Sequence, residues 1–180
     1  MPPRNLPLLT HLSQPHLEPG GIEVTADINA LGMLQLRYRI TLKDVRLPAP
    51  QTPGAADGLW QHTCCEAFVA EAGSAYREFN FSPSGQWACY RFTAYRERDE
   101  GFIPGTAPLI EYQLHPDGFE LCATLPAALL PARDPLTIGL TAVIEHTDGR
   151  MQYWALTHGA AQPDFHLRQS FVLTLNRSTP

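Results

Sequence analysis

The sequence has no long hydrophobic run, no concentration of positive charge and no leader-like start. Its apolar stretches fall well short of the roughly 20 residues that a membrane-spanning helix needs. The first twenty residues are interrupted by prolines and lack the apolar segment of a secretion signal. The net charge of −5, without a basic stripe, gives no electrostatic footprint for nucleic acid. We therefore expect neither a membrane nor a nucleic acid among its partners.

Cysteines are also few, and none of the four is spaced as CxxC. The adjacent pair, Cys64 and Cys65, would point to opposite faces of a strand, and Cys89 and Cys122 lie alone in strand-like runs. This pattern predicts reduced, mostly buried thiols and a cytoplasmic protein.

The motifs of several enzyme classes are missing too. The chain has no GxSxG, no phosphate-binding loop, no dinucleotide-binding glycine pattern and no CxxCH haem attachment motif. The sequence therefore favours a binding module over an enzyme.

What the chain does have is an almost continuous alternation of apolar and polar residues. With 180 residues, 44% hydrophobic and 17% charged, it can form one globular domain with a sizeable core. Strands are expected at 22–29, 33–42, 64–71, 75–82, 86–96, 109–115, 118–125, 136–146, 150–158 and 170–175. Only residues 126–130 could form a helical turn. We predict an all-β fold, an antiparallel β-sandwich or jelly roll of about ten strands, as a single domain over 1–180 with an irregular segment at 1–20.

The clearest turn signal is Ser82-Pro83-Ser84-Gly85, which lies between two aromatic, alternating runs. A tight turn there would pair Phe81 with Gln86 and Asn80 with Trp87. Because strand side chains alternate, this register sorts the hairpin onto two faces. The core face would hold Phe79, Phe81, Ala88, Tyr90 and Phe92. The other face would gather Glu78, Asn80, Trp87 and Arg91, a mixture that indicates a ligand site.

The preceding strand adds a second polar row. Trp60, His62, Cys64, Glu66 and Phe68 are spaced two apart, which predicts that they share one face. Three of them, His62, Cys64 and Glu66, are possible ligands for a metal or groups for catalysis, but no zinc knuckle is present. We therefore expect a packed histidine and a buried cysteine, with no metal. Alternatively, Trp60 and Trp87 could simply cover the edge of the core. Glu66 and Glu78 could likewise be exposed or salt-bridged strand carboxylates.

Three segments resemble a known family. Trp60-x5-Glu66, FNFSPSGQW at 79–87 and YWALTHGAAQPDFH at 153–166 are similar to motifs of bacterial DOMON-like proteins, which are related to family-nine carbohydrate-binding modules. The resemblance covers the chain from about Ile22 onward. It implies a β-sandwich that binds a small ligand, usually a sugar or haem, and performs no chemistry of its own.

Carried onto this sequence, the resemblance implies roles for several residues. Trp60 would stack on a sugar ring, Glu66 would accept hydrogen bonds from ring hydroxyls, and a second aromatic would lie near Phe165 or His166. Arg91 could replace a basic hydrogen-bonding residue of the relatives.

We therefore predict a non-catalytic module for a small molecule, most simply a carbohydrate-type polyhydroxy ligand, without a cofactor. Two alternatives stay open. One is a haem-binding redox module, for which the possible axial ligands are Met33, Met151, His146, His158 and His166. The other is an enzyme that uses the face formed by His62, Cys64 and Glu66. No pattern in the sequence sets an oligomeric state.

Overall fold

The computed structural model describes residues 5–177, and these form a curled β-sheet of thirteen strands. The strands are β1 (Asn5–Thr10), β2 (Ile22–Ile28), β3 (Leu34–Ile40), β4 (Gly54–Ala55), β5 (Cys64–Ala70), β6 (Tyr76–Phe81), β7 (Gln86–Ala94), β8 (Glu97–Arg98), β9 (Leu109–His115), β10 (Gly118–Leu125), β11 (Leu136–Glu145), β12 (Met151–Ala155) and β13 (Leu173–Leu175). Three short 3-10 helices, η1 (Leu59–Gln61), η2 (Ala127–Leu129) and η3 (Arg168–Ser170), complete the regular structure.

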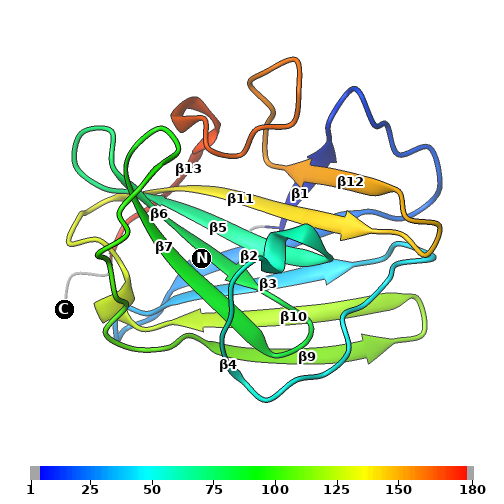
Figure 1. Cartoon of the computed structure of the whole chain (residues 1–180), viewed down its shortest axis with the longest axis horizontal. Coiled ribbons are helices and arrows are strands. Elements are labelled where there is room, and N and C mark those ends of the chain that lie inside the picture. Colours follow the sequence, from blue (N-terminus) through cyan, green and yellow to red (C-terminus); the bar gives the residue numbers. More distant parts are fainter. Residues whose placement is uncertain (1–4, 178–180) are drawn as a thin grey trace.

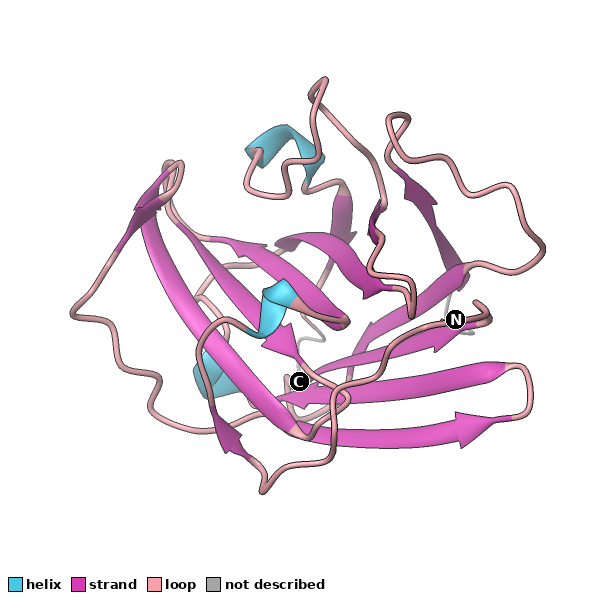
Figure 2. Ribbon diagram, turned by 45° about the vertical axis from the view of Figure 1, so that its right-hand side comes forward, coloured by secondary structure: helices cyan, strands magenta, loops and turns pink. Residues whose placement is uncertain are grey.

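The sheet is folded into two layers that share one strand (Figure 1). The main path runs β4-β7-β6-β5-β11-β12-β1-β2-β3-β10-β9. Residues 5–8 of β1 pair with β2, whereas Leu9 and Thr10 pair with β12. Strands β2, β3, β10 and β9 thus form a back layer, and β11, β5, β6 and β7 a front layer. Figure 2 shows that long loops gather on one side of the strands.

The main core fills the space between the layers. Its fully buried side chains alternate along each strand, as in β3, where Leu34, Leu36, Tyr38 and Ile40 point inward. From the front layer, Phe79 and Phe81 enter the same core. A second, smaller aromatic cluster lies on the other face of the front layer, around Phe68, Tyr76 and Phe92. Because both faces of the front layer carry apolar side chains, its strands are buried almost throughout.

The predicted all-β class and ten of the strands are confirmed, and η2 lies in the one predicted helical segment. Two expectations are wrong. The sheet is mixed, because β4 pairs in parallel with β7. The N-terminal segment is not irregular over its whole length: residues 5–10 form β1, while residues 1–4 lie outside the described part. Pro7 of β1 lies where β2 is the strand's only partner, and a proline is tolerated at such an edge.

The hairpin at 82–85 forms where predicted, but its register is shifted by one residue. Phe81 pairs with Trp87 and Asn80 with Ala88. The backbone N–H of Ser82 donates to the carbonyl of Gln86, which leaves a three-residue loop in which Gly85 has φ 91°. Such loops end in a glycine bulge, whereas the prediction assumed a two-residue turn. A shift of one residue moves every β7 side chain to the opposite face.

Gly85→Ala is expected to lower the free energy of unfolding by about 1–2 kcal/mol, because an L side chain disfavours a left-handed backbone. The added Cβ would lie 3.6 Å from its nearest neighbour, the carbonyl oxygen of Gln51, so the cost is conformational and not steric. Gly85→Asn should lose less. Gly105→Ala, where no positive φ and no neighbour intervene, is the matched control in urea denaturation. Equal losses in Gly85→Ala and Gly105→Ala would contradict the bulge.

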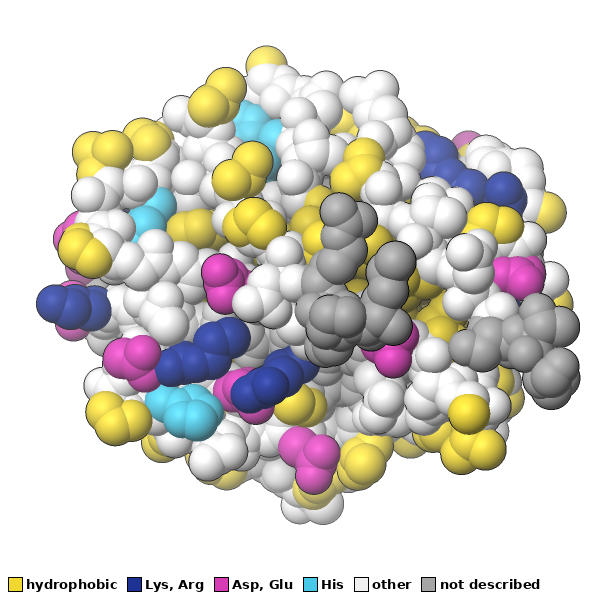
Figure 3. Space-filling model, turned by 180° about the vertical axis from the view of Figure 1, so that it is seen from behind, with side chains coloured by type: hydrophobic (Ala, Val, Ile, Leu, Met, Phe, Trp, Pro, Cys, Tyr) yellow, Lys and Arg dark blue, Asp and Glu magenta, His cyan; other side chains and the backbone are white. Residues whose placement is uncertain are grey.

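The outer surface of the back layer carries charges of both signs next to one another (Figure 3). Arg37 of β3 lies 2.6 Å from Glu120 of β10, so neighbouring strands neutralise each other. All four cysteines are free, three of them buried and Cys122 half-buried. No helix within residues 5–177 is long and apolar enough to cross a membrane.

Candidate functional site

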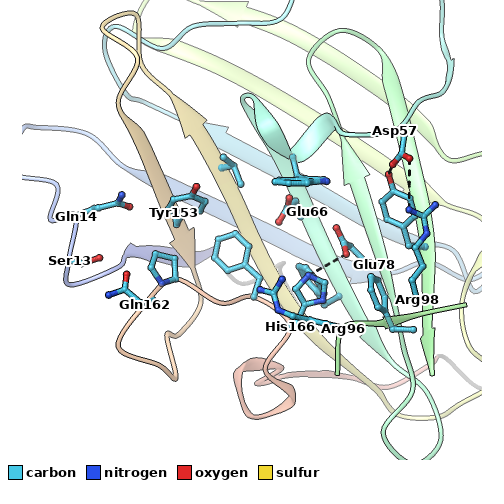
Figure 4. A pocket seen from close by; sticks show the side chains of 17 residues that line it. Ser13, Gln14, Asp57, Glu66, Glu78, Arg96, Arg98, Tyr153, Gln162 and His166 are labelled. Carbon is cyan, nitrogen blue, oxygen red and sulfur yellow. Dashed lines mark hydrogen bonds and ion pairs between the residues drawn. The ribbon is translucent and has the colours of Figure 1, made fainter. Parts of the chain in front are cut away.

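A cavity of about 630 Å³ opens on the loop-bearing face of the front layer (Figure 4). Its floor is made by β5, β6, β7 and β11, and its walls by η1, the turn at 95–96 with β8, β12 and the loop after β12. The lining side chains are Ser13, Gln14, Asp57, Trp60, Glu66, Phe68, Glu78, Tyr90, Phe92, Arg96, Arg98, Val143, Tyr153, Gln162, Pro163, Phe165 and His166. Segments from both ends of the chain thus meet around one pocket.

Two glutamates on the pocket floor come from neighbouring strands. Glu66 of β5 pairs with Asn80 of β6, and Glu78 of β6 pairs with Phe68 of β5. The two carboxyl groups are therefore diagonal neighbours on one face of an antiparallel pair, within reach of each other. The hydroxyl of Tyr38, from the back layer, donates to the backbone carbonyl of Glu66 at 2.6 Å. This contact ties the floor to the main core.

Both carboxyl groups are largely removed from solvent, with 2% of Glu66 and 5% of Glu78 exposed. Oε2 of Glu66 accepts a hydrogen bond from Thr141 at 2.9 Å, and Oε1 of Glu78 accepts one from Asn80 at 3.1 Å. Burial raises the pKa of Glu66 well above its usual range, and the neighbouring Glu78 raises it further. Burial also raises the pKa of Glu78, to about 7, against the hydrogen bond from Asn80. Burial therefore favours the neutral form of both floor carboxyls, and Glu78 titrates near neutrality.

His166 borders the floor and is held in one orientation. Its Nδ1 lies 2.7 Å from the hydroxyl of Tyr76, whose oxygen also accepts the backbone N–H of Arg96 at 3.1 Å. This hydrogen bond with Tyr76 fixes the orientation of the imidazole ring. Nε2 lies 3.7 Å from Oε2 of Glu78 (Figure 4). Burial and the charge of Arg96 lower the pKa of His166 to about 4, so the ring is neutral at neutral pH.

The two arginines of the pocket already have partners. Arg96 pairs with Asp164 at 3.0 Å. Arg98 lies over the ring of Tyr90, with the guanidinium carbon 4.2 Å from the ring centroid, and 3.9 Å from Asp57. The hydroxyl of Tyr90 in turn donates to Asp57, and this hydrogen bond holds the pKa of that carboxyl below its usual range.

Trp60 supplies the largest solvent-facing aromatic surface of the pocket. It lies in η1, which follows Gly58 in a left-handed conformation, and half of its surface is exposed. Phe165 lines the same cavity from the loop after β12 and packs against Phe68 and Tyr153, with ring centroids 6.4 and 6.0 Å apart. The pocket thus combines aromatic walls with polar groups on its floor.

Three solved structures share this architecture. A candidate carbohydrate-binding protein from Bacteroides uniformis aligns with 97% of this chain and 85% of its own, at 17% identity and a TM-score of 0.66. A family 9 carbohydrate-binding module from Caldicellulosiruptor kristjanssonii in complex with glucose aligns with 92% of this chain and 80% of its own, at 11% identity and a TM-score of 0.58. A family 9 carbohydrate-binding module from the same organism in complex with cellotriose aligns with 96% of this chain and 82% of its own, at 10% identity and a TM-score of 0.60. The chain has the fold of these modules. Neither a protein-family model nor a curated protein sequence matches it.

Five of the nine predicted ligand-binding residues line the pocket of this module-like fold. They are Trp60, Glu66, Glu78, Phe165 and His166. Asn80 shares their face but lies fully buried beneath it, where it donates to Glu78. Its contribution is to support the floor, not to form its surface.

Three predicted residues do not belong to the pocket. Trp87 and Arg91 lie on the opposite face of β7 because of the register shift: Trp87 packs on the main core, and Arg91 pairs with Glu71 and Asp99. His62 lies outside because residues 59–61 form a helical turn, so the strand alternation begins only at Cys64. Its Nδ1 lies 2.7 Å from Glu145.

The face expected to unite His62, Cys64 and Glu66 is therefore not formed. Within residues 5–177, no group of three histidine, cysteine or acidic side chains is arranged to hold a metal. Burial raises the pKa of Cys64 well above its usual range, so the thiolate needed for nucleophilic attack is disfavoured.

Most of the pocket's charged and aromatic wall was not predicted from the sequence. Asp57, Arg96, Arg98 and Tyr153 were not singled out, and Tyr90 and Phe92 were assigned to the core. A three-residue loop ending in Gly85 shifts the alternation of β7 by one residue. Recognising that loop in the sequence would have placed Tyr90 and Phe92 on the pocket face. Of the histidines and methionines weighed as haem ligands, His166 alone lines this cavity, and its Nδ1 contacts Tyr76.

Proposed function

We propose that the domain binds a carbohydrate-type polyhydroxy ligand in this pocket and carries out no chemistry on it. The observation that carries the proposal is the half-exposed ring of Trp60 in the same cavity as the buried carboxyls of Glu66 and Glu78. An aromatic face packs against the C–H face of a sugar ring, while carboxyl groups take hydrogen bonds from its hydroxyls.

The position of the carboxyl groups supports binding over hydrolysis. Glycosidases place two carboxyls on either side of the bond that breaks. Here Glu66 and Glu78 rise from neighbouring strands on one face of the sheet. A ring lying on this floor would meet both groups from the same side, where they can hold adjacent hydroxyls.

The finer assignments are part of the same proposal. The solved structures of the same fold include complexes with glucose and with cellotriose, which makes glucose-type sugars the first ligands to test. We assign the domain to the DOMON-like group, as a cytoplasmic sugar-binding module without a bound cofactor.

The test is titration calorimetry with a panel of monosaccharides and short glucans, followed in parallel by tryptophan fluorescence. Binding should change the emission of Trp60, because a stacked sugar removes water from the exposed indole. An absorption spectrum of the purified protein separates the haem alternative, since a Soret band would indicate a porphyrin. If no sugar in the panel binds at millimolar concentration, the proposed function is wrong.

Trp60→Ala is expected to weaken sugar binding by about 1–3 kcal/mol, the range for losing an aromatic anchor. Stability should change little, because half of the residue is already exposed. Trp87→Phe is the matched control, since Trp87 lies on the opposite face of β7 and should leave affinity unchanged. If Trp60→Ala bound the same sugars as tightly as the wild type, the stacking role would be excluded.

A further inference from the structure

The arginines that line the pocket are paired with carboxylates other than the two on its floor. Arg96 is paired with Asp164, and Arg98 lies between Asp57 and Glu100, 3.9 and 3.7 Å from their oxygens. Neither arginine lies within ion-pair distance of Glu66 or Glu78 in the described residues. Their charges act on Glu78 only from farther away.

The other groups that face the two glutamates are neutral. Glu66 receives the hydroxyl of Thr141, and Glu78 receives the amide of Asn80. Nε2 of His166 lies 3.7 Å from Glu78, but the ring carries no charge at neutral pH. Two buried carboxyls therefore lie side by side without a cation in contact with them.

The open position on Glu66 faces the cavity. Its Oε1 has no hydrogen-bond partner among residues 5–177, whereas Oε2 is bound to Thr141. Figure 4 shows the carboxyl groups of Glu66 and Glu78 both directed into the pocket. A carboxyl that is only 2% exposed and has one free oxygen aimed at a cavity is a site for a donor group of a ligand.

We propose that the natural ligand is an amino sugar or a similar hydroxylated amine, whose ammonium group binds between Glu66 and Glu78. This inference rests on the proposed function and narrows its ligand class. An ammonium offers three donors, enough for both carboxyls, and its positive charge stabilises the ionised form of each carboxyl, which burial alone disfavours. The ring of Phe68, opposite Glu78 on the same face, adds an aromatic surface near the cation. An acidic sugar is disfavoured, because the arginines that could bind it are already paired.

The experiment compares each hexosamine with its parent hexose by titration calorimetry at pH 6.5. Glucosamine, galactosamine and mannosamine are the amines, and N-acetylglucosamine is the uncharged control of similar size. The matching amine should bind at least about tenfold more tightly than its parent sugar, the effect expected of hydrogen bonds between charged groups. Repeating the titration in two buffers of different ionisation enthalpy should reveal proton release with the amine and none with the hexose. The protons come from the two carboxyls, which ionise beside the ammonium.

Two variants assign the effect to these carboxyls. Glu66→Gln and Glu78→Gln should each abolish most of the preference for the amine, measured as the ratio of amine to hexose affinity within each variant, because an uncharged amide cannot pair with the ammonium. Glu100→Gln, an exposed carboxylate outside the pocket, should keep the preference. If hexoses bind and no hexosamine binds more tightly, the inference is overturned and the proposed function stands. If neither hexoses nor hexosamines bind, both are overturned.

Discussion

Phe79→Ala is expected to lower the free energy of unfolding by about 3–5 kcal/mol, the cost of truncating a buried aromatic side chain. Phe79 is completely buried between the layers and stacks near Phe81, with ring centroids 6.5 Å apart. Neighbouring strands on both sides of β6 restrict collapse around the vacated volume, so the cost should fall in the upper part of this range. Urea denaturation followed by circular dichroism measures it.

Ile103→Ala is the control for this substitution, because that side chain is 84% exposed and its loss should change stability by less than about 0.5 kcal/mol. A loss below about 1 kcal/mol for Phe79→Ala would mean that β6 does not face the main core with this side chain. The phase of the whole floor, including Glu78 and Asn80, would then be wrong as well.

The free energy of unfolding of Glu78→Gln, relative to that of the wild type, is expected to increase as the pH rises. The pKa of Glu78 is raised from 4.5 to about 7 in the folded protein, mainly by burial. Folding therefore favours the neutral form of Glu78. The stability that this preference adds to the wild type is complete below pH 4.5 and is lost as the pH rises through about 7. At about 1.4 kcal/mol per pKa unit, the stability of Glu78→Gln relative to wild type should rise by about 3 kcal/mol between pH 4 and pH 8.

The comparison has to be made between the variant and the wild type, because His166 acts in the opposite sense. Its folded pKa of about 4 lies below its usual 6.5, so its contribution is complete above pH 6.5 and is lost as the pH falls through 4. The two residues partly cancel in the wild-type profile. A constant difference for Glu78→Gln from pH 4 to pH 8 would mean that Glu78 ionises as it does in water.

Much of the fold follows from local pattern alone. Alternation of apolar and polar residues locates the half-buried strands of the back layer, such as β3 and β10, and the front-layer strands, buried on both faces, stand out as apolar and aromatic runs between turn signals. The pattern did not reveal β1, because Pro2, Pro3 and Pro7 read as interruptions, although a strand with one free edge accepts proline. β4 and β8 have two residues each, too few for any periodicity.

The site was harder to predict, because it depends on register and on contacts between distant segments. Glu66 and Glu78 line one cavity as expected, since their strand phase does not depend on the hairpin. Trp87 and Arg91 were misplaced by a single bulge at Gly85. Arg96 and His166 meet through Tyr76, although 70 residues or more separate His166 from the other two, and no local pattern encodes such a contact.

The sharing of β1 between the two layers has a consequence for the order in which the domain can fold during synthesis. Leu9 and Thr10 pair with Ala155 and Trp154, so the end of β1 cannot pair until β12 has been synthesised. The imidazole of His11 is hydrogen-bonded to the carbonyl of Ala160 at 3.0 Å. This contact near the pocket wall also needs a segment that is synthesised late. Contacts so far apart in sequence slow folding. A nascent chain therefore cannot present a finished pocket, and the cavity is complete only once nearly all of the domain has left the ribosome.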